Sequence, residues 1–306
     1  MLSALVAHLT IEIGMDPEIR KFGGLLLTWH GVFTALGIAV GVYAAVLIAR
    51  RLNYLDDDVY GAALVAIPCG IIGARALFVA ENWGDPGLDS VMDAIRVNEG
   101  GISIYGAVIG GFIGGGIYGW FRKVNMLRSL DVAAAGLILG MGIGRIGDII
   151  NGEHFAETSG LPWAVRYTNL DSPSVLAHPK CGLSPFTSVE DLCAQHPAVG
   201  YEMLGDFIIF GLLAFAIFRF RRDGLAFFGM LLTYSLMRFG VSELRIDSEE
   251  VFGGLTVPQV TALGIIPIAV LGLGYVLRRG PRDEPSYMNP PPAPSAAPAG
   301  TKARQT

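Results

Sequence analysis

The stretch AAAGLILGMGIGRIGDIINGEH, residues 133–154, joins a long apolar run to a polar end. The run is apolar enough for the interior of a lipid bilayer, yet it contains Arg145 and Asp148. Ionisable residues are rare inside membrane spans, face the interior of the helix bundle and are candidates for function. The stretch therefore predicts a membrane-spanning helix with a functional site near one end.

The composition of the whole chain is typical of an integral membrane protein. Of its 306 residues, 52% are hydrophobic and 16% are charged, and the mean hydropathy is +0.50. Soluble domains carry about 25% charged residues, and a helix needs about 20 apolar residues to cross the hydrocarbon core. We therefore predict an all-α membrane protein with about seven spans: Gly24–Ala49, Val59–Ala80, Gly101–Phe121, Leu130–Ile150, Gly200–Phe218, Leu225–Val241 and Thr256–Leu277.

Basic residues between the spans predict the orientation of the chain. They follow the first, fifth and seventh spans and fill the loop between the third and fourth: Arg50, Arg51, Arg122, Lys123, Arg128, Arg219, Arg221, Arg222, Arg278, Arg279 and Arg282. Loops rich in Lys and Arg stay in the cytoplasm, so we expect the N-terminus outside and the C-terminus in the cytoplasm. No typical signal peptide precedes the first span, which we expect to remain in the mature protein.

We divide the chain into five parts. These are an outer segment (1–23), four spans (24–150), an outer loop (151–199) expected to form a small extramembrane cap, three spans (200–280) and a disordered Pro/Ala-rich tail (281–306). Cys181 and Cys193 in the outer loop either form a disulfide or stay free, and Cys69 is expected to be inert packing. The 41 glycines favour close helix packing, with close approach of a lipid as the alternative.

Arginines in or near the spans predict a site for an anion. Arg75 and Arg145 lie within predicted spans, and Arg238 and Arg245 are seven residues apart, on one helical face. Guanidinium groups bind phosphate through paired hydrogen bonds and keep their charge. The residues therefore predict an enzyme or carrier that holds an anionic phospholipid headgroup, although Arg–Asp pairs that only lock helices together are the alternative. The histidines show no metal-ligand spacing, so we predict no metal.

At these residues the chain resembles a known family. GRIGDIINGE, residues 144–153, is similar to the signature of prolipoprotein diacylglyceryl transferases, usually GRxGNFxNGE. Further motifs follow in the family's order: LTWHGVF, GARALFV, RVNEGGISIYGAVIGG, LPWAVRY, HPAVGYE and YSLMRFGVSELRID. The resemblance extends from about Asp16 to Arg279 and implies the family's seven-helix topology.

The resemblance also implies an activity in the bacterial inner membrane. The family moves the diacylglyceryl group of phosphatidylglycerol to the thiol of a lipobox cysteine in a preprolipoprotein, which forms a thioether and releases glycerol-1-phosphate. The expected partners are phosphatidylglycerol, other membrane lipids and lipoprotein signal peptides, with no cofactor and no nucleic acid. The expected catalytic residues are Arg145, Arg238, Tyr105 and His30, and the expected lipid- or phosphate-binding residues are Arg145, Arg238, Arg245, Asn151, Glu153, Asp148, Tyr234 and Arg75.

The chain departs from the family's pattern at five places, one of which is the histidine-proline motif: it reads HPAVGYE, residues 196–202, without the usual Ser/Thr-Gln-Leu. Asp148 replaces an asparagine, Tyr105 a histidine, His30 a tyrosine, and Ser242 a glutamate, with Glu243 one residue later. Asp148 could quench Arg145 or act as a base, and His30 either handles the thiol proton or is a packed, hydrogen-bonded side chain. These changes leave two alternatives to the family's reaction: a transferase with another lipid donor or acceptor, and a lipid-binding protein without activity.

Overall fold

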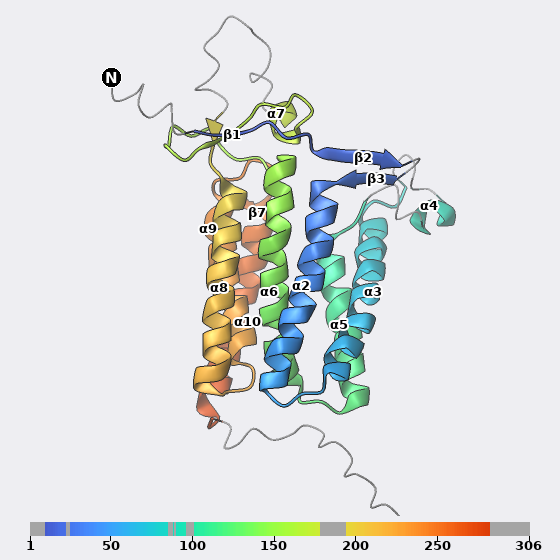
Figure 1. Cartoon of the computed structure of the whole chain (residues 1–306), viewed down its shortest axis with the longest axis vertical. Helices are drawn as coiled ribbons and strands as arrows, with labels where there is room; N and C mark the ends of the chain where they lie inside the picture. Colours follow the sequence, from blue (N-terminus) through green and yellow to red (C-terminus); the bar gives the residue numbers. More distant parts are fainter. Residues whose placement is uncertain are drawn as a thin grey trace, which may run out of the picture.

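The computed structural model describes residues 10–22, 25–84, 88, 90–95, 101–177 and 194–281. Seven of its helices are long and apolar enough to cross a membrane (Figure 1): α2 (Trp29–Arg51), α3 (Asp56–Glu81), α5 (Ile104–Arg122), α6 (Met126–Asn151), α8 (Ala198–Phe220), α9 (Leu225–Ser242) and α10 (Val257–Arg278). The predicted seven-span helical membrane fold is confirmed. The possible disulfide and nearly all of the Pro/Ala-rich tail fall outside the described residues.

A small cap covers one end of the bundle and contains short strands that the all-α prediction did not include. Its sheet has the order β1-β4-β5, with β1 (Ile11–Ile13) parallel to β4 (Val165–Tyr167) and β5 (Ala194–Gln195) antiparallel to β4. Two hairpins and two short helices complete the non-spanning elements: β2 (Glu18–Phe22) with β3 (Leu25–Thr28), β6 (Glu250–Phe252) with β7 (Leu255–Thr256), α4 (Val91–Ile95) and α7 (Pro173–Ala177). Figure 1 shows β1 and α7 above the end of α6.

The predicted basic clusters lie at the end of the bundle away from the cap. The helices α2, α5, α8 and α10 all end there in Figure 1, each with arginine in its last turn. Arg222 donates from Nη1 to the carbonyls of Val276 at 3.2 Å and Leu277 at 2.8 Å. These carbonyls belong to the last turn of α10, where partners within the helix run out, and the Val276 carbonyl also accepts from the N–H of Arg279 at 3.1 Å. A single basic end is what the predicted orientation requires, and the side of the membrane stays a prediction.

Glycine allows α2 and α6 to pack backbone against backbone. A Cβ atom on Gly41 would lie 2.5 Å from the carbonyl oxygen of Gly136. A Cβ atom on Gly140 would lie 2.8 Å from the carbonyl oxygen of Gly37. Small residues permit such approaches in membrane helices, where packing stabilises association because lipid is as apolar as the side chains. These contacts confirm the packing interpretation of the glycines in this stretch.

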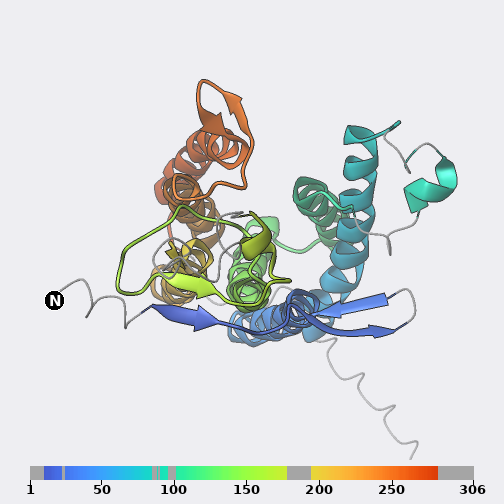
Figure 2. The same ribbon diagram turned by 90° about the horizontal axis from the view of Figure 1, so that it is seen from above.

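The central helix of the bundle is α6. It packs against α2, α8 and α9. Figure 2, viewed from above, shows α6 between α8 and the α3–α5 pair, with α2 alongside it. The cap-side end of α6 carries the polar part of the opening stretch, and the cap-side ends of α2 and α8 lie beside it. This arrangement brings the polar ends of several spans together below the cap.

The α2–α6 packing leads to a prediction about stability. Gly140→Ala places a methyl group against the backbone of Gly37, and overpacking of this kind costs about 1–3 kcal/mol. Gly264→Ala is the control, because a Cβ atom on Gly264 in α10 would meet nothing within 4 Å. We expect thermal unfolding in detergent to show a lower Tm for the first variant and an equal or higher Tm for the control. Equal Tm values for both variants would show that this approach does not limit stability.

Candidate functional site

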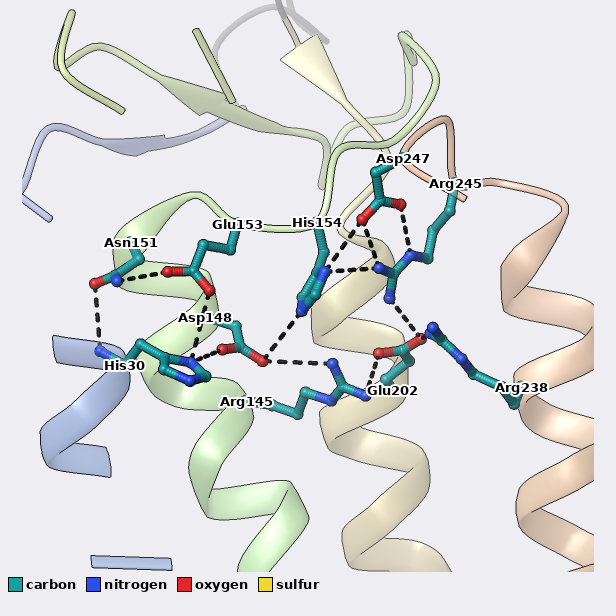
Figure 3. Close-up of polar contacts among 10 residues, drawn as sticks. All are labelled: His30, Arg145, Asp148, Asn151, Glu153, His154, Glu202, Arg238, Arg245 and Asp247. Carbon is teal, nitrogen blue, oxygen red and sulfur yellow. Dashed lines mark hydrogen bonds and ion pairs between the residues drawn. The ribbon is translucent and has the colours of Figure 1, made fainter. Parts of the chain in front are cut away.

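Ten polar side chains gather at the cap-side ends of α2, α6, α8 and α9 and in the loops that follow α6 and α9 (Figure 3). They are His30, Arg145, Asp148, Asn151, Glu153, His154, Glu202, Arg238, Arg245 and Asp247. The group contains seven of the residues predicted from the sequence: Arg145, Arg238, Arg245, Asp148, Asn151, Glu153 and His30. The structure therefore joins the signature of α6, the start of α2, Arg238 of α9 and Arg245 beyond it into one site.

The carboxylate of Glu202 in α8 holds three arginines. Its Oε2 lies 2.9 Å from Nη2 of Arg145. Its Oε1 accepts a hydrogen bond from Nη1 of Arg238 and another, at 3.3 Å, from Nη1 of Arg245. Glu202 is fully buried, and the side chains of Arg145 and Arg245 are 13% and 3% exposed. A buried charge needs partners of this kind, because taking it out of water costs several kcal/mol.

Glu202 was not among the predicted site residues, although the sequence carried a signal for it. It lies at the start of a predicted apolar span, and Asp206 follows one turn later. The rule that singled out the arginines, that ionisable residues within spans are functional candidates, applies equally to these acids. The prediction applied this rule to the arginines and Asp148 but not to the acids of α8.

Arg245 lies beyond α9, in the turn that follows Ser242. The expectation that it shares a helical face with Arg238 is therefore wrong, because the helix ends first. Arg245 also donates to Asp247, from Nε at 2.9 Å and Nη2 at 2.6 Å, and its Nη2 lies 2.7 Å from Nδ1 of His154. Burial opposes ionisation of Asp247, but hydrogen bonds with His154 and Arg245 outweigh it and hold the pKa of this carboxyl below its usual range.

His30 and Asp148, two of the positions that depart from the family's pattern, are in direct contact. Nδ1 of His30 forms a hydrogen bond with Oδ1 of Asp148, and Oδ2 of Asp148 accepts from Nη1 of Arg145 at 3.4 Å. The contact depends on Gly147, where a Cβ atom would lie 2.7 Å from Cα of His30. Asp148 therefore pairs with Arg145, and it also fixes the imidazole of His30.

The end of α6 turns the remaining signature residues back toward the site. Gly152 has a left-handed φ of 72° and closes the helix, and His154 also has a positive φ, 66°. Positive φ is strained for a residue with a side chain and concentrates at functional sites. Asn151 donates to Glu153 at 2.9 Å and accepts from the backbone N–H of His30 at 3.4 Å. The signature thus wraps around the start of α2.

One part of the cluster has the donors of a metal site. One ligand atom each from His30, Asp148 and Glu153 lies within 4.8 Å of the other two. However, Asp148 already pairs with the guanidinium of Arg145 and with His30. A divalent cation at this point would lie next to the permanent positive charge of Arg145. We therefore assign the compensation of the negative charge of Asp148 to Arg145 and the imidazole of His30.

Two predicted residues make their polar contacts away from the cluster. Arg75 donates to the carbonyls of Ala94 at 2.9 Å and Gly101 at 2.7 Å, and these bonds tie α4 and the start of α5 to α3. The hydroxyl of Tyr105 accepts a hydrogen bond from Thr261 in α10 at 3.2 Å. Arg75 therefore makes contacts of a structural kind, and the hydroxyl of Tyr105, an expected catalytic residue, is hydrogen-bonded to α10.

Tyr234, Ser242 and Glu243 lie in or directly after α9 but make no ion pair with the arginines among the described residues. Tyr234 packs against the hydrophobic core below the site. The hydroxyl of Ser242 donates to the carbonyl of Arg238 at 2.7 Å, and Glu243 accepts from Gln259 at the start of α10 at 2.5 Å. Neither Ser242 nor Glu243 supplies a carboxylate to the arginines; Glu202 does.

Comparison with known proteins agrees with the resemblance found in the sequence. The model of the prolipoprotein diacylglyceryl transferase family matches residues 17–275. The phosphatidylglycerol–prolipoprotein diacylglyceryl transferase of Dehalococcoides mccartyi (strain BAV1) is 32% identical over 272 residues, which is 88% of this chain and 96% of that protein. Proteins of the same name from Clostridioides difficile and Acaryochloris marina are 31% and 32% identical, over 82% and 86% of this chain and 92% of each relative.

The pairing of Asp247 predicts a pH-dependent contribution to stability. Because the pKa of Asp247 is lowered by folding, its stabilisation is full above the ordinary aspartate pKa of about 3.9 and is lost as the pH falls. We expect Asp247→Asn to cost about 1–3 kcal/mol at pH 7, and the difference from wild type to shrink between about pH 5 and pH 3. Thermal unfolding in detergent across this range measures it. The control is Asp171→Asn on the exposed surface, and a difference independent of pH would contradict the assignment.

Proposed function

Because the chain belongs to the prolipoprotein diacylglyceryl transferase family, we propose that it transfers the diacylglyceryl group of phosphatidylglycerol to the cysteine thiol of a prolipoprotein. The observation that supports this proposal is that Arg145, Arg238 and Arg245 all form ion pairs with the buried carboxylate of Glu202. No observation favours another donor or acceptor, or a protein without activity.

The reaction needs two kinds of assistance from the protein. The sulfur forms a bond to the glycerol carbon while the bond from that carbon to the phosphate oxygen breaks, and the electron pair of the broken bond stays on the phosphate. The thiol loses its proton, and negative charge grows on the departing glycerol-1-phosphate. The site must therefore stabilise a phosphate and accept a proton.

Arg145 and Arg238 are our candidates for phosphate stabilisation. They come from different helices and meet at one buried carboxylate, so both guanidinium groups point into the same small region (Figure 3). Preorganised positive charge in a water-poor site stabilises developing negative charge without reorganisation. Arg245 forms ion pairs with both Asp247 and Glu202, so we assign it the role of positioning the carboxylate of Glu202.

His30 is our candidate for the proton acceptor. Its Nδ1 is bonded to Asp148, which leaves Nε2 as the other ring nitrogen, and no partner for it occurs among the described residues. A carboxylate on one nitrogen fixes the tautomer in which the second nitrogen accepts a proton. The imidazole is 45% exposed, so a thiol can reach it. The two departures from the family's pattern then form one functional pair.

The placement of the site supports the expected substrates and location. The polar cluster lies at the cap end, opposite the basic end of the bundle. If the basic end faces the cytoplasm, the site opens at the outer side of the bacterial inner membrane. There phosphatidylglycerol can enter from the bilayer, and the signal peptide of a preprolipoprotein can present its lipobox cysteine.

The experiment that tests this function is diacylglyceryl transfer from phosphatidylglycerol to a lipobox peptide by the purified protein. We expect Arg145→Ala and Arg238→Ala each to lower kcat/KM by at least about 100-fold, the usual cost of removing an electrostatic contact to the transition state. Arg219→Ala is the matched control, since Arg219 is an exposed arginine at the opposite end of α8. Absence of transfer by the folded wild-type protein would reject the proposed function.

The His30–Asp148 pair predicts coupled substitutions. His30→Tyr and Asp148→Asn each break the contact, and the double variant installs the two residue types usual in the family. We expect each single variant to lose about 10-fold to 100-fold in kcat and the double variant to be more active than the product of the two losses predicts. Transfer kinetics at saturating phosphatidylglycerol measure the cycle. Strictly multiplicative losses would show that the two residues act independently.

A further inference from the structure

Asp206 in α8 is a buried acid to which the proposed mechanism gives no role. It is fully buried, and neither carboxyl oxygen has a hydrogen-bond partner in the part of the chain that the structure describes. It lies one helical turn from Glu202 and therefore on the same face of α8. Its side chain packs on α6, where a Cβ atom on Gly142 would lie 3.3 Å from Cβ of Asp206.

The surroundings of Asp206 place it beside the arginine cluster. Among the described residues, the charged groups that interact with it are Arg145 from α6, Arg238 from α9 and Glu202 from its own helix, and the Tyr234 hydroxyl of α9 is also near. An ionised carboxylate without a hydrogen bond is very costly in an apolar interior. Protonation of Asp206 avoids this cost and gives the carboxyl an O–H group to donate.

Glu202 has one oxygen that needs such a donor. Oε1 binds both Arg238 and Arg245, whereas within the described segments Oε2 has only the ion pair with Arg145, whose geometry gives no hydrogen bond. Arg145 also pairs with Asp148, so its guanidinium is already engaged by two carboxylates. A substrate phosphate can take Arg145 only if Oε2 of Glu202 finds another partner, because a buried oxygen left unpaired is costly.

We propose that Asp206 is a positioning residue whose protonated carboxyl donates an O–H hydrogen bond to Oε2 of Glu202 when the phosphate of phosphatidylglycerol binds Arg145 in its place. No covalent bond changes in this step: Asp206 keeps its proton and Glu202 keeps its charge and its contacts with Arg238 and Arg245. The exchange lets Arg145 turn to the phosphate without leaving Glu202 unpaired. The inference rests on the proposed function, since it names how that site admits its lipid.

The role predicts opposite effects on stability and on lipid binding. Asp206→Leu removes a buried polar group that has no partner in the resting state, so we expect a higher Tm. The same change removes the donor for Glu202, so we expect dioctanoyl-phosphatidylglycerol to bind at least about 10-fold more weakly in detergent calorimetry. Asp206→Asn keeps a donor in its NH₂ group, and we expect affinity within about threefold of wild type.

Asp131 provides the matched control at the other end of the bundle. It is equally buried but accepts hydrogen bonds from the backbone N–H groups of Gly224 at 2.7 Å and Phe227 at 2.8 Å. Asp131→Asn should lower the Tm and leave lipid affinity unchanged, the reverse of Asp206→Leu.

Binding and unfolding are read without the acceptor peptide, so this test is separate from that of transfer. If the wild-type protein binds dioctanoyl-phosphatidylglycerol but transfers nothing, the proposed function is rejected. The role of Asp206 in lipid binding is then decided by the Asp206 variants alone. Unchanged affinity in Asp206→Leu would overturn the inference, and so would a lower Tm, which would show a structural partner. Equal loss of affinity in the Asn and Leu variants would overturn the donor role.

Discussion

The carboxylate of Glu202 between three guanidinium groups is the contact on which the rest of the site depends. Arginine keeps its charge in proteins, so arginines that meet near the interior of a bundle repel one another unless an acid joins them. Glu202 is fully buried at that point and binds arginines from α6, from α9 and from the turn after α9. A bundle with this centre can present positive charge to a lipid phosphate and still fold.

The packing of the helices and the chemistry of the site are parts of one arrangement. The glycines that bring α2 against α6 continue to Gly147, where the backbone of His30 would collide with any side chain. That close approach allows His30 to form its hydrogen bond with Asp148, and Asp148 in turn accepts a hydrogen bond from Arg145. The polar chain therefore runs from the exposed imidazole to the buried arginines through contacts that glycine packing makes possible.

The aspartate in the signature stretch gains an explanation from these contacts. Asp148 reaches Arg145 with one oxygen and His30 with the other, so it links a phosphate-binding candidate to a proton-accepting candidate. His154 adds a further contact and joins the same acid to Asp247 and Arg245. Tyr105 lies outside this network and instead connects α5 to α10 through Thr261.

The sequence by itself determined the seven spans and the basic end and named seven of the ten residues that meet in the polar cluster, because hydrophobic length and intramembrane charge are local properties. Only the tertiary structure decided which charges meet: His30 and Asp148 are 118 residues apart, and Glu202 and Arg245 are 43 apart. The strands of the cap have only two to five residues, too few for a periodic pattern. The end of α9 before Arg245 and the role of Glu202 depend on how helices pack, which hydropathy along one chain does not encode.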